Sequence, residues 1–154
     1  MPRVGWQVFK RVLICHDGSA AGLRALKRGG ELAVLLKPKV HVLSFYSGNQ
    51  SEAFMAASVV GVQCVVDLEA EHQASLQQCV DWLTARGVEA QGHLAHGNTI
   101  DEIVEHAERL GIDLIVIGHY PKAGGGRWWS GKDRAALTDR VNCSVFIAVG
   151  DPAH

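Results

Sequence analysis

The sequence predicts a single α/β domain, a doubly wound five-stranded parallel sheet with helices on both faces. Three observations lead to this prediction. Short apolar runs alternate with longer stretches of helical period, the runs hold few polar residues, and 154 residues suffice for one sizeable core. Apolar residues make up 47% and charged residues 20%, which is typical of an ordinary globular protein.

Short runs rich in Val, Ile and Leu are predicted to be buried strands. They are VLIC (12–15), VHVLSF (40–45), LIVI (114–117) and VFIAV (145–149), with VEAQGHLAH (88–96) as a weaker fifth candidate. Because polar residues do not alternate within the four strong runs, they are typical of parallel strands covered on both faces.

Stretches of helical period lie between these runs. They cover residues 21–36, 68–83 and 100–110, and a last helix is predicted over 132–141. Pro38, Gly87 and Gly111 follow the first three stretches as stop signals. The resulting strand–helix alternation requires right-handed crossovers between parallel strands.

Two long irregular segments, 47–63 and 119–131, follow the second and the fourth of the five predicted strands in chain order. Segments of this length in a compact domain are usually functional or disordered. Residues 53–66 are rich in apolar side chains, and two interpretations stay open for them. They form either the first part of the second helix or a mobile flap near the carboxyl ends of the strands.

Charge and cysteine spacing exclude several classes of protein. A net charge of −1 and a pI of about 6.7 give no indication of nucleic acid or an anionic membrane as a partner. The apolar stretch at 53–66 is too short to insert across a bilayer. The four cysteines form no C-x-x-C pair, so no zinc or thioredoxin spacing is present. With no apolar signal core near the N-terminus, we expect a cytoplasmic protein with reduced thiols.

The first strand ends in His16-Asp17-Gly18-Ser19, and Gly18 and Ser19 are expected to open the following helix. The Asp17 carboxylate could accept from a ribose hydroxyl or an adenine amino group. Equally, Asp17 could only stabilise the turn. His16 and Asp17 are adjacent and point to opposite faces, so they do not predict a catalytic dyad.

The stretch after Gly118 and His119 contains Lys122, Arg127, Lys132 and Arg134, against the single acid Asp133. Gly124–Gly126 allow close approach of a ligand, and Gly131 leads into a helix whose N–H groups suit an anion. The alternative is a solvated loop with Trp128 and Trp129 packed on the domain or on a partner.

A Walker-type phosphate loop is not predicted in this stretch. GRWWSGK (126–132) fits the G-x-x-x-x-G-K frame, but Asp133 stands where the Mg²⁺-binding hydroxyl belongs.

The remaining histidines give no catalytic or metal motif. His93 and His96 are three residues apart on a predicted strand and therefore point to opposite faces. His106 is predicted on the polar, solvated side of its helix. No catalytic residue and no metal ligand is therefore assigned.

The chain resembles the universal stress protein family over residues 9–149, one domain followed by a short tail at 150–154. KRVLICHDGSAAGLRAL (10–26) resembles the opening of the family, and HGNTIDEIVEHAERLGIDLIVIG (96–118) resembles its most recognisable block. The spacing from Gly131 to Cys143 matches the closing helix and last strand. The resemblance implies an adenine nucleotide alpha hydrolase-like fold with strand order 3-2-1-4-5 and a stress-response role.

The resemblance also implies a nucleotide site. Nucleotide-binding members have Gly-x-x-Gly, nine residues, then Gly-Ser/Thr; here Gly118 and Gly131 match, whereas Pro121 and Lys132 replace the second Gly and the Ser/Thr. Together these matches imply weak binding of ATP or AMP, with Mg²⁺ left open. The implied site residues are Asp17, Gly18, Ser19, Gly118, His119, Gly131, Lys132 and Asp133.

Two functional classes follow from this resemblance. One is a nucleotide-binding stress regulator. The other is a nucleotide-independent homodimeric interaction or signalling protein acting through loops 47–63 and 119–131 on a protein partner. No general base stands out, so an activity beyond a weak ATPase is not expected. The apolar last strand, Ser144–Val149, is expected at a sheet edge, where it would pair with its mate in a homodimer.

Overall fold

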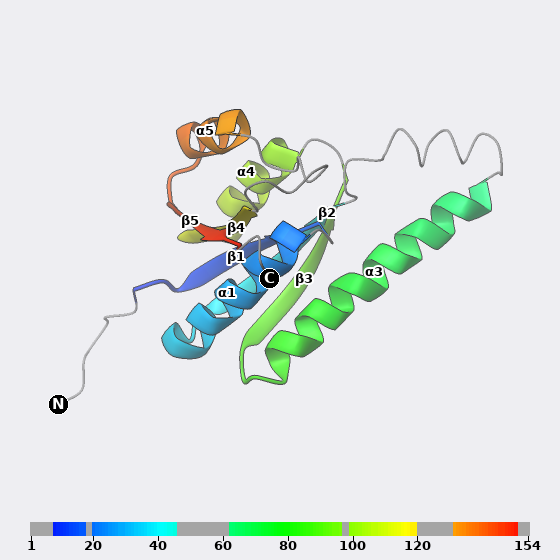
Figure 1. Ribbon diagram of the computed structural model, residues 1–154, viewed down its shortest axis with the longest axis horizontal. Helices are drawn as coiled ribbons and strands as arrows, with labels where there is room; N and C mark the ends of the chain where they lie inside the picture. The colour runs from blue at the N-terminus through cyan, green and yellow to red at the C-terminus, as the bar shows by residue number, and fades with distance from the viewer. Residues whose placement is uncertain (1–7, 18–19, 46–61, 97–98, 120–130, 151–154) are drawn as a thin grey trace.

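The computed structural model describes residues 8–17, 20–45, 62–96, 99–119 and 131–150, and Figure 1 shows how their helices and strands are arranged. Along the chain the elements are β1 (Arg11–His16), α1 (Ala20–Leu36), β2 (Lys39–Phe45), α3 (Val62–Thr84), β3 (Glu89–Ala95), α4 (Thr99–Leu110), β4 (Leu114–His119), α5 (Gly131–Arg140) and β5 (Ser144–Val149). This alternation confirms the predicted α/β class.

The described strands form one five-stranded sheet in the order β3-β2-β1-β4-β5, and every neighbouring pair is parallel. This order confirms the predicted 3-2-1-4-5 topology. The weaker candidate at 88–96 is the edge strand β3, and β5 forms the opposite edge. Their edge positions explain why both strands are more exposed than β1, β2 and β4.

The two faces of the sheet belong to two separate apolar clusters, because successive residues of a strand point to opposite faces. Val12 and Ile14 of β1 pack in the cluster to which α1 and α3 contribute. Leu13 and Cys15 pack in the cluster to which α4 and α5 contribute. The unbroken apolar run of β1 therefore serves both helical layers, as expected of a central parallel strand.

Three helix ends coincide with the predicted stop signals. α1 ends before Lys37, which has a left-handed φ of 53°, and Pro38 follows it. Gly87 and Gly111, with φ of 80° and 65°, follow α3 and α4 in the conformation that glycine adopts most easily. Each of these three helices is therefore followed, within three residues, by a residue with left-handed backbone conformation.

The boundaries of the two long irregular segments need correction. α3 begins at Val62, so residues 62–66 belong to a helix and not to a flap, and the prediction that 47–63 is irregular is wrong for its last two residues. Each residue added to an existing helix gains a hydrogen bond, which outweighs the slightly unfavourable helix propensity of valine. His119 ends β4 and Gly131 starts α5. Residues 46–61 and 120–130 lie outside the described part of the chain.

The described cysteines are free thiols with little access to water. Cys15 and Cys79 are buried and Cys143 is half-buried. Burial is the main cause that raises the pKa of all three thiols, and the negative charges of Asp17 and Asp113 add to the effect at Cys15 and Cys143 respectively. These thiols therefore stay protonated at neutral pH.

A close contact between backbones holds α1 against β4. A Cβ atom added to Gly118 would lie 1.7 Å from the carbonyl oxygen of Ala21 and 2.5 Å from its carbonyl carbon. No side chain fits between these two backbones, so a glycine at position 118 is a requirement of the fold whatever the protein binds.

We expect Gly118→Ala to destabilise the protein by about 3 kcal/mol or more, because the methyl group forces α1 away from the sheet. The measurement is the free energy of unfolding in urea. Gly131→Ala is the matched control, since among the described residues a Cβ there would meet only Arg134 Nη2, at 3.7 Å. Equal stability of the two variants would contradict the proposed constraint.

Candidate functional site

The carboxyl ends of β1 and β4 lie side by side at the centre of the sheet, where Ile14 is in register with Val116. α1 leaves β1 toward one face of the sheet, and α5 follows β4 on the other face. The chain therefore diverges above these two strands, and this is the switch point at which open α/β sheets bind ligands. The residues predicted as a site follow these two strands.

Asp17 is buried directly above β1, with 6% of its surface exposed. Its carboxylate lies against the first turn of α1, because a Cβ added to Gly22 would lie 2.6 Å from Asp17 Oδ1. An acidic group at a helix N-terminus is favoured by the helix dipole. The missing side chain of Gly22 is what gives the carboxylate this position, and the sequence interpretation did not identify Gly22.

His119 ends β4 and is held from two sides. Its carbonyl oxygen accepts a hydrogen bond from the backbone N–H of Gly150 at 2.7 Å. Arg134 of α5 donates from Nη1 to His119 Nδ1 at 3.2 Å, which requires that this nitrogen carries no proton. Arg134 thus fixes the orientation of the imidazole and links α5 to the end of β4.

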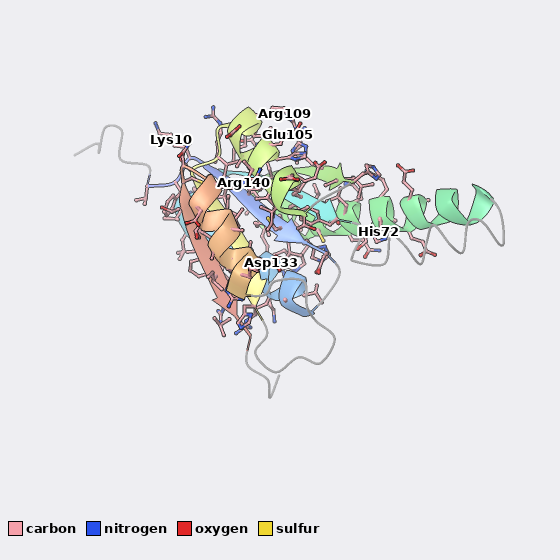
Figure 2. The ribbon with its side chains drawn as sticks, turned by 90° about the horizontal axis from the view of Figure 1, so that it is seen from above. Lys10, His72, Glu105, Arg109, Asp133 and Arg140 are labelled. Carbon is pink, nitrogen blue, oxygen red and sulfur yellow. The ribbon has the colours of Figure 1, made fainter. Side chains whose placement is uncertain are left out.

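The N-terminus of α5 presents the remaining predicted residues. Gly131 and Lys132 are exposed, and Asp133 is half-buried in the first turn. Figure 2 shows Asp133 and Arg140 at opposite ends of α5, and Arg140 Nη1 pairs with Asp101 Oδ1 of α4 at 2.6 Å. A free helix N-terminus with a lysine suits an anion, whereas the Asp133 carboxylate opposes one.

The structure therefore brings together one half of the predicted site. Asp17, Gly118 and His119 lie around the ends of β1 and β4. Gly18 and Ser19 lie outside the described residues, as do the glycine run and two of the four cations, Lys122 and Arg127.

Comparison with known proteins decides the family. A sequence model described as "Universal stress protein family" matches residues 9–148. The chain belongs to this family. The chain is 27% identical to universal stress protein MJ0531 of Methanocaldococcus jannaschii over 147 residues, which cover 94% of this chain and 85% of the relative. It is 24% identical to universal stress protein YxiE of Bacillus subtilis, covering 91% and 99% of the two chains.

Solved structures show the same fold for this universal stress protein. The hypothetical protein MJ0577 superposes with a TM-score of 0.72 at 20% identity, covering 92% of this chain and 96% of the other. A universal stress protein in complex with cAMP gives 0.62 at 24% identity, covering 90% and 95%. One from Archaeoglobus fulgidus in complex with dAMP gives 0.58 at 20% identity, covering 92% and 98%.

Across the described ranges, no three His, Cys, Asp or Glu side chains are grouped so as to hold a metal ion. In the same ranges, no helix combines the length and apolar character needed to cross a membrane.

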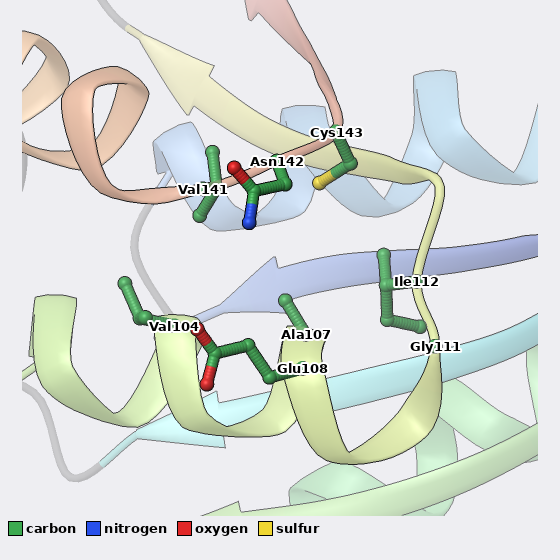
Figure 3. A pocket seen from close by; sticks show the side chains of 8 residues that line it. All are labelled: Val104, Ala107, Glu108, Gly111, Ile112, Val141, Asn142 and Cys143. Atoms are coloured by element: carbon green, nitrogen blue, oxygen red, sulfur yellow. The ribbon is translucent and has the colours of Figure 1, made fainter.

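A hollow of about 320 Å³ lies between α4 and the connection from α5 to β5, as Figure 3 shows. Its polar side chains include Glu108 and Asn142, and the thiol of Cys143 reaches it from one side. The hollow lies at the opposite end of the sheet from Asp17, near the start of β5, and so forms no part of the site.

A buried group of histidines beneath α4 corrects one sequence prediction. His106 is 8% exposed and not solvated, and its Nδ1 donates to the carbonyl oxygen of Glu102 at 2.7 Å. Its ring meets that of His93 at a centroid distance of 5.7 Å, and His93 Nε2 lies 2.9 Å from His41 Nδ1. β2 and β3 thus offer α4 a polar surface, which the period of the helix alone could not reveal.

The two strand histidines are held neutral. Burial is the main cause that lowers the pKa of His41, and it lowers the pKa of His93 to about 4. The positive charges of Lys39, Arg11 and Arg109 add to the effect on His41, and Glu89 opposes it. The neighbouring histidines and Arg109 act on His93 in the same direction as burial. His96, by contrast, lies near Glu69 of α3, on the other side of the sheet from His93, as predicted.

We expect the histidine group to make stability depend on pH. A histidine with a lowered folded pKa stabilises the protein above its unfolded pKa of about 6.5, and this contribution is lost as the pH falls toward the folded pKa. The free energy of unfolding should therefore decrease from pH 7 to pH 4.5. His93→Phe removes a group that takes up about one proton on unfolding. The free energy of unfolding of this variant should therefore decrease less steeply with falling pH than that of the wild type.

Urea titrations at several pH values measure this difference. His96→Gln is the matched control, because His96 is exposed, and it should follow the wild type. Parallel pH curves for wild type and His93→Phe would show that the histidine group does not carry the effect.

Proposed function

We propose that this universal stress protein binds an adenine nucleotide, ATP or AMP, in the crevice above β1 and β4 and acts as a stress-response regulator. The observation that carries the proposal is the buried carboxylate of Asp17, which lies at the start of α1 beside Gly22 at the switch point of the sheet. The cAMP and dAMP complexes of two proteins with the same fold support an adenine nucleotide as the ligand.

Each residue of the site has a role in this proposal. Asp17 accepts a hydrogen bond from the ribose or the adenine amino group. Gly118 keeps α1 close to β4, and His119 borders the crevice. The phosphate lies at the N-terminus of α5, near Gly131 and Lys132.

The phosphate end of the site is the weaker half. Lys132 replaces a hydroxyl with a cation, which favours a phosphate, but Asp133 brings a negative charge to the same turn. Pro121 offers no backbone N–H donor. We therefore propose a dissociation constant on the order of tens of micromolar. Mg²⁺ is not part of the proposal.

Thermal unfolding with and without nucleotide tests the proposal. At AMP concentrations about 100 times the dissociation constant, bound ligand adds about 2.7 kcal/mol, which raises the Tm by roughly 5–10 °C for a chain of this size. Asp17→Asn should lose most of this shift in Tm. The carboxylate only accepts hydrogen bonds, whereas the asparagine amide is uncharged and turns one side of the group into a donor. Asp139→Asn, which changes an exposed acid on the far end of α5, should keep it.

The same titration with ATP, ADP and cAMP identifies the preferred nucleotide. Absence of a shift with all four nucleotides at millimolar concentration would refute nucleotide binding. The second candidate, a nucleotide-independent homodimeric interaction protein, would then stand. The apolar edge strand β5 favours a homodimer whether or not the protein binds a nucleotide.

β5 offers an uncovered edge to a second copy of the chain. Phe146, Ile147 and Val149 are exposed by 37%, 39% and 55% although all three are large and apolar. Among the described strands β5 pairs only with β4, so its other side has no strand partner there, although the Val149 carbonyl oxygen accepts a hydrogen bond from Arg24 Nε at 3.4 Å. An apolar edge of this kind favours pairing with a further strand. We propose that two copies pair β5 antiparallel about a two-fold axis.

Light scattering at micromolar concentration tests the dimer. Wild type should have the mass of two chains, and Ile147→Lys should have the mass of one, because a buried ammonium group at the centre of the interface is costly. Leu35→Lys is the control, because Leu35 is 77% exposed on α1 and its replacement should leave the dimer intact. A monomeric wild type, or a dimeric Ile147→Lys, would contradict the proposal.

A further inference from the structure

A second cleft lies between α1 and α3, the two helices on one side of the sheet in Figure 1. Its volume of about 420 Å³ is within the usual range for sites that bind small molecules. Leu23 and Leu26 of α1 and Trp82 of α3 provide apolar walls. Gly30 of α1 packs closely against the Trp82 ring, since a Cβ there would lie 2.5 Å from it. The cleft is thus a built hollow between two helices and not a gap at a loop.

His16 lies in this cleft, and among the described residues it has no good hydrogen-bond partner. The residue is 3% exposed. Among the described residues, its ring nitrogens meet only the thiol of Cys79, at 3.8 and 3.9 Å. A thiol is a weak partner, and these distances are long even for sulfur. A buried polar side chain without a good partner is costly, so His16 indicates a ligand group that completes its hydrogen bonding.

The protonation state of His16 limits which ligand group fits. Burial is the main cause that lowers the pKa of His16, and the nearby Asp17 charge opposes this only in part. The imidazole is therefore neutral at pH 7 and offers one donor and one acceptor. A hydroxyl group can satisfy either nitrogen, because it both donates and accepts.

The positive charge of Lys27 at the rim of the cleft limits the ligand further. Lys27 lines the cleft, is exposed, and makes no ion pair within the described residues. The other lining side chains are apolar or uncharged at neutral pH, Ser75 and Gln78 among them, and no described carboxylate lines the cleft. The cleft therefore favours an anion at its rim.

The wall formed by Trp82 favours a flat ligand. The guanidinium carbon of Arg86 lies 3.8 Å from the centroid of the Trp82 ring, which fixes the indole from one side. An aromatic ring held in this way gives a large apolar surface at little cost in conformational entropy.

We propose that the cleft between α1 and α3 is a second binding site, which takes a small hydroxylated aromatic acid. The hydroxyl group bonds to His16, the ring packs between Leu23, Leu26 and Trp82, and the carboxylate approaches Lys27. The site is distinct from the proposed nucleotide crevice, because its lining, although it includes His16 at the end of β1, contains none of Asp17, Gly118 and Lys132.

Calorimetric titration of the full chain with three related compounds tests the proposal. The probe is 4-hydroxycinnamate, which has both polar ends; cinnamate lacks the hydroxyl group, and 4-hydroxycinnamamide lacks the carboxylate. Wild type should bind the probe with a Kd on the order of 100 µM and each of the other two compounds about tenfold more weakly.

Two variants assign the polar ends separately. His16→Phe should abolish the preference for 4-hydroxycinnamate over cinnamate, because the phenyl ring keeps the shape and removes both nitrogens. Lys27→Ala should abolish the preference for the acid over its amide, and as a surface change it should leave folding intact. Lys10→Ala, another exposed lysine, is the matched control and should keep both preferences.

Three results would overturn the proposal. One is the absence of saturable binding up to about 5 mM. Another is a set of affinities unchanged in both His16→Phe and Lys27→Ala. The third is displacement of the probe by AMP with equal efficiency in wild type and Lys27→Ala, which would place the probe in the nucleotide crevice. The first two results leave the nucleotide proposal unaffected, and the third would support it, since AMP displaces the probe only if AMP itself binds.

Discussion

The contact between the backbone of α1 at Ala21 and the backbone of β4 at Gly118 determines how the rest of the molecule is placed. It brings the first turn of α1 over the centre of the sheet, so that Gly22 lies next to the carboxylate of Asp17. The same docking sets the position of Leu23 and Leu26, which form one wall of the cleft toward α3. One glycine thus links the packing of a helix to two surfaces that could receive ligands.

The α/β fold was predictable because each buried strand can be recognised from its own short run of apolar residues. A run such as VLIC (12–15) is apolar on both faces, and a strand of that kind needs helices on both sides. The strand order came from the family resemblance and not from the runs, since Val and Ile contain no information about which strands are neighbours. The start of α3 stayed open in the sequence, because the periodic pattern begins at Leu68 and residues 53–66 fitted either the first part of the helix or a flap; the helix begins at Val62.

The candidate site was predictable only where one residue carried the chemistry. Asp17 stands out as an acid at the end of an apolar strand. Gly22 and Arg134 do not stand out, because their importance comes from three-dimensional neighbours, Asp17 in one case and His119 in the other. His106 was misplaced for the same reason. A helical wheel assigns a histidine to the polar face, and it cannot know that His41 and His93 lie beneath that face.

The protonated thiols described above have a consequence for redox chemistry. Oxidants such as peroxides react with the thiolate and hardly with the thiol, so a cysteine whose pKa is raised by burial is oxidised slowly. Cys15 lies in the central strand, where a sulfinic or sulfonic acid could not be accommodated without opening the core. Keeping this thiol inert allows the sheet to survive oxidising conditions that would inactivate a protein with exposed thiolates.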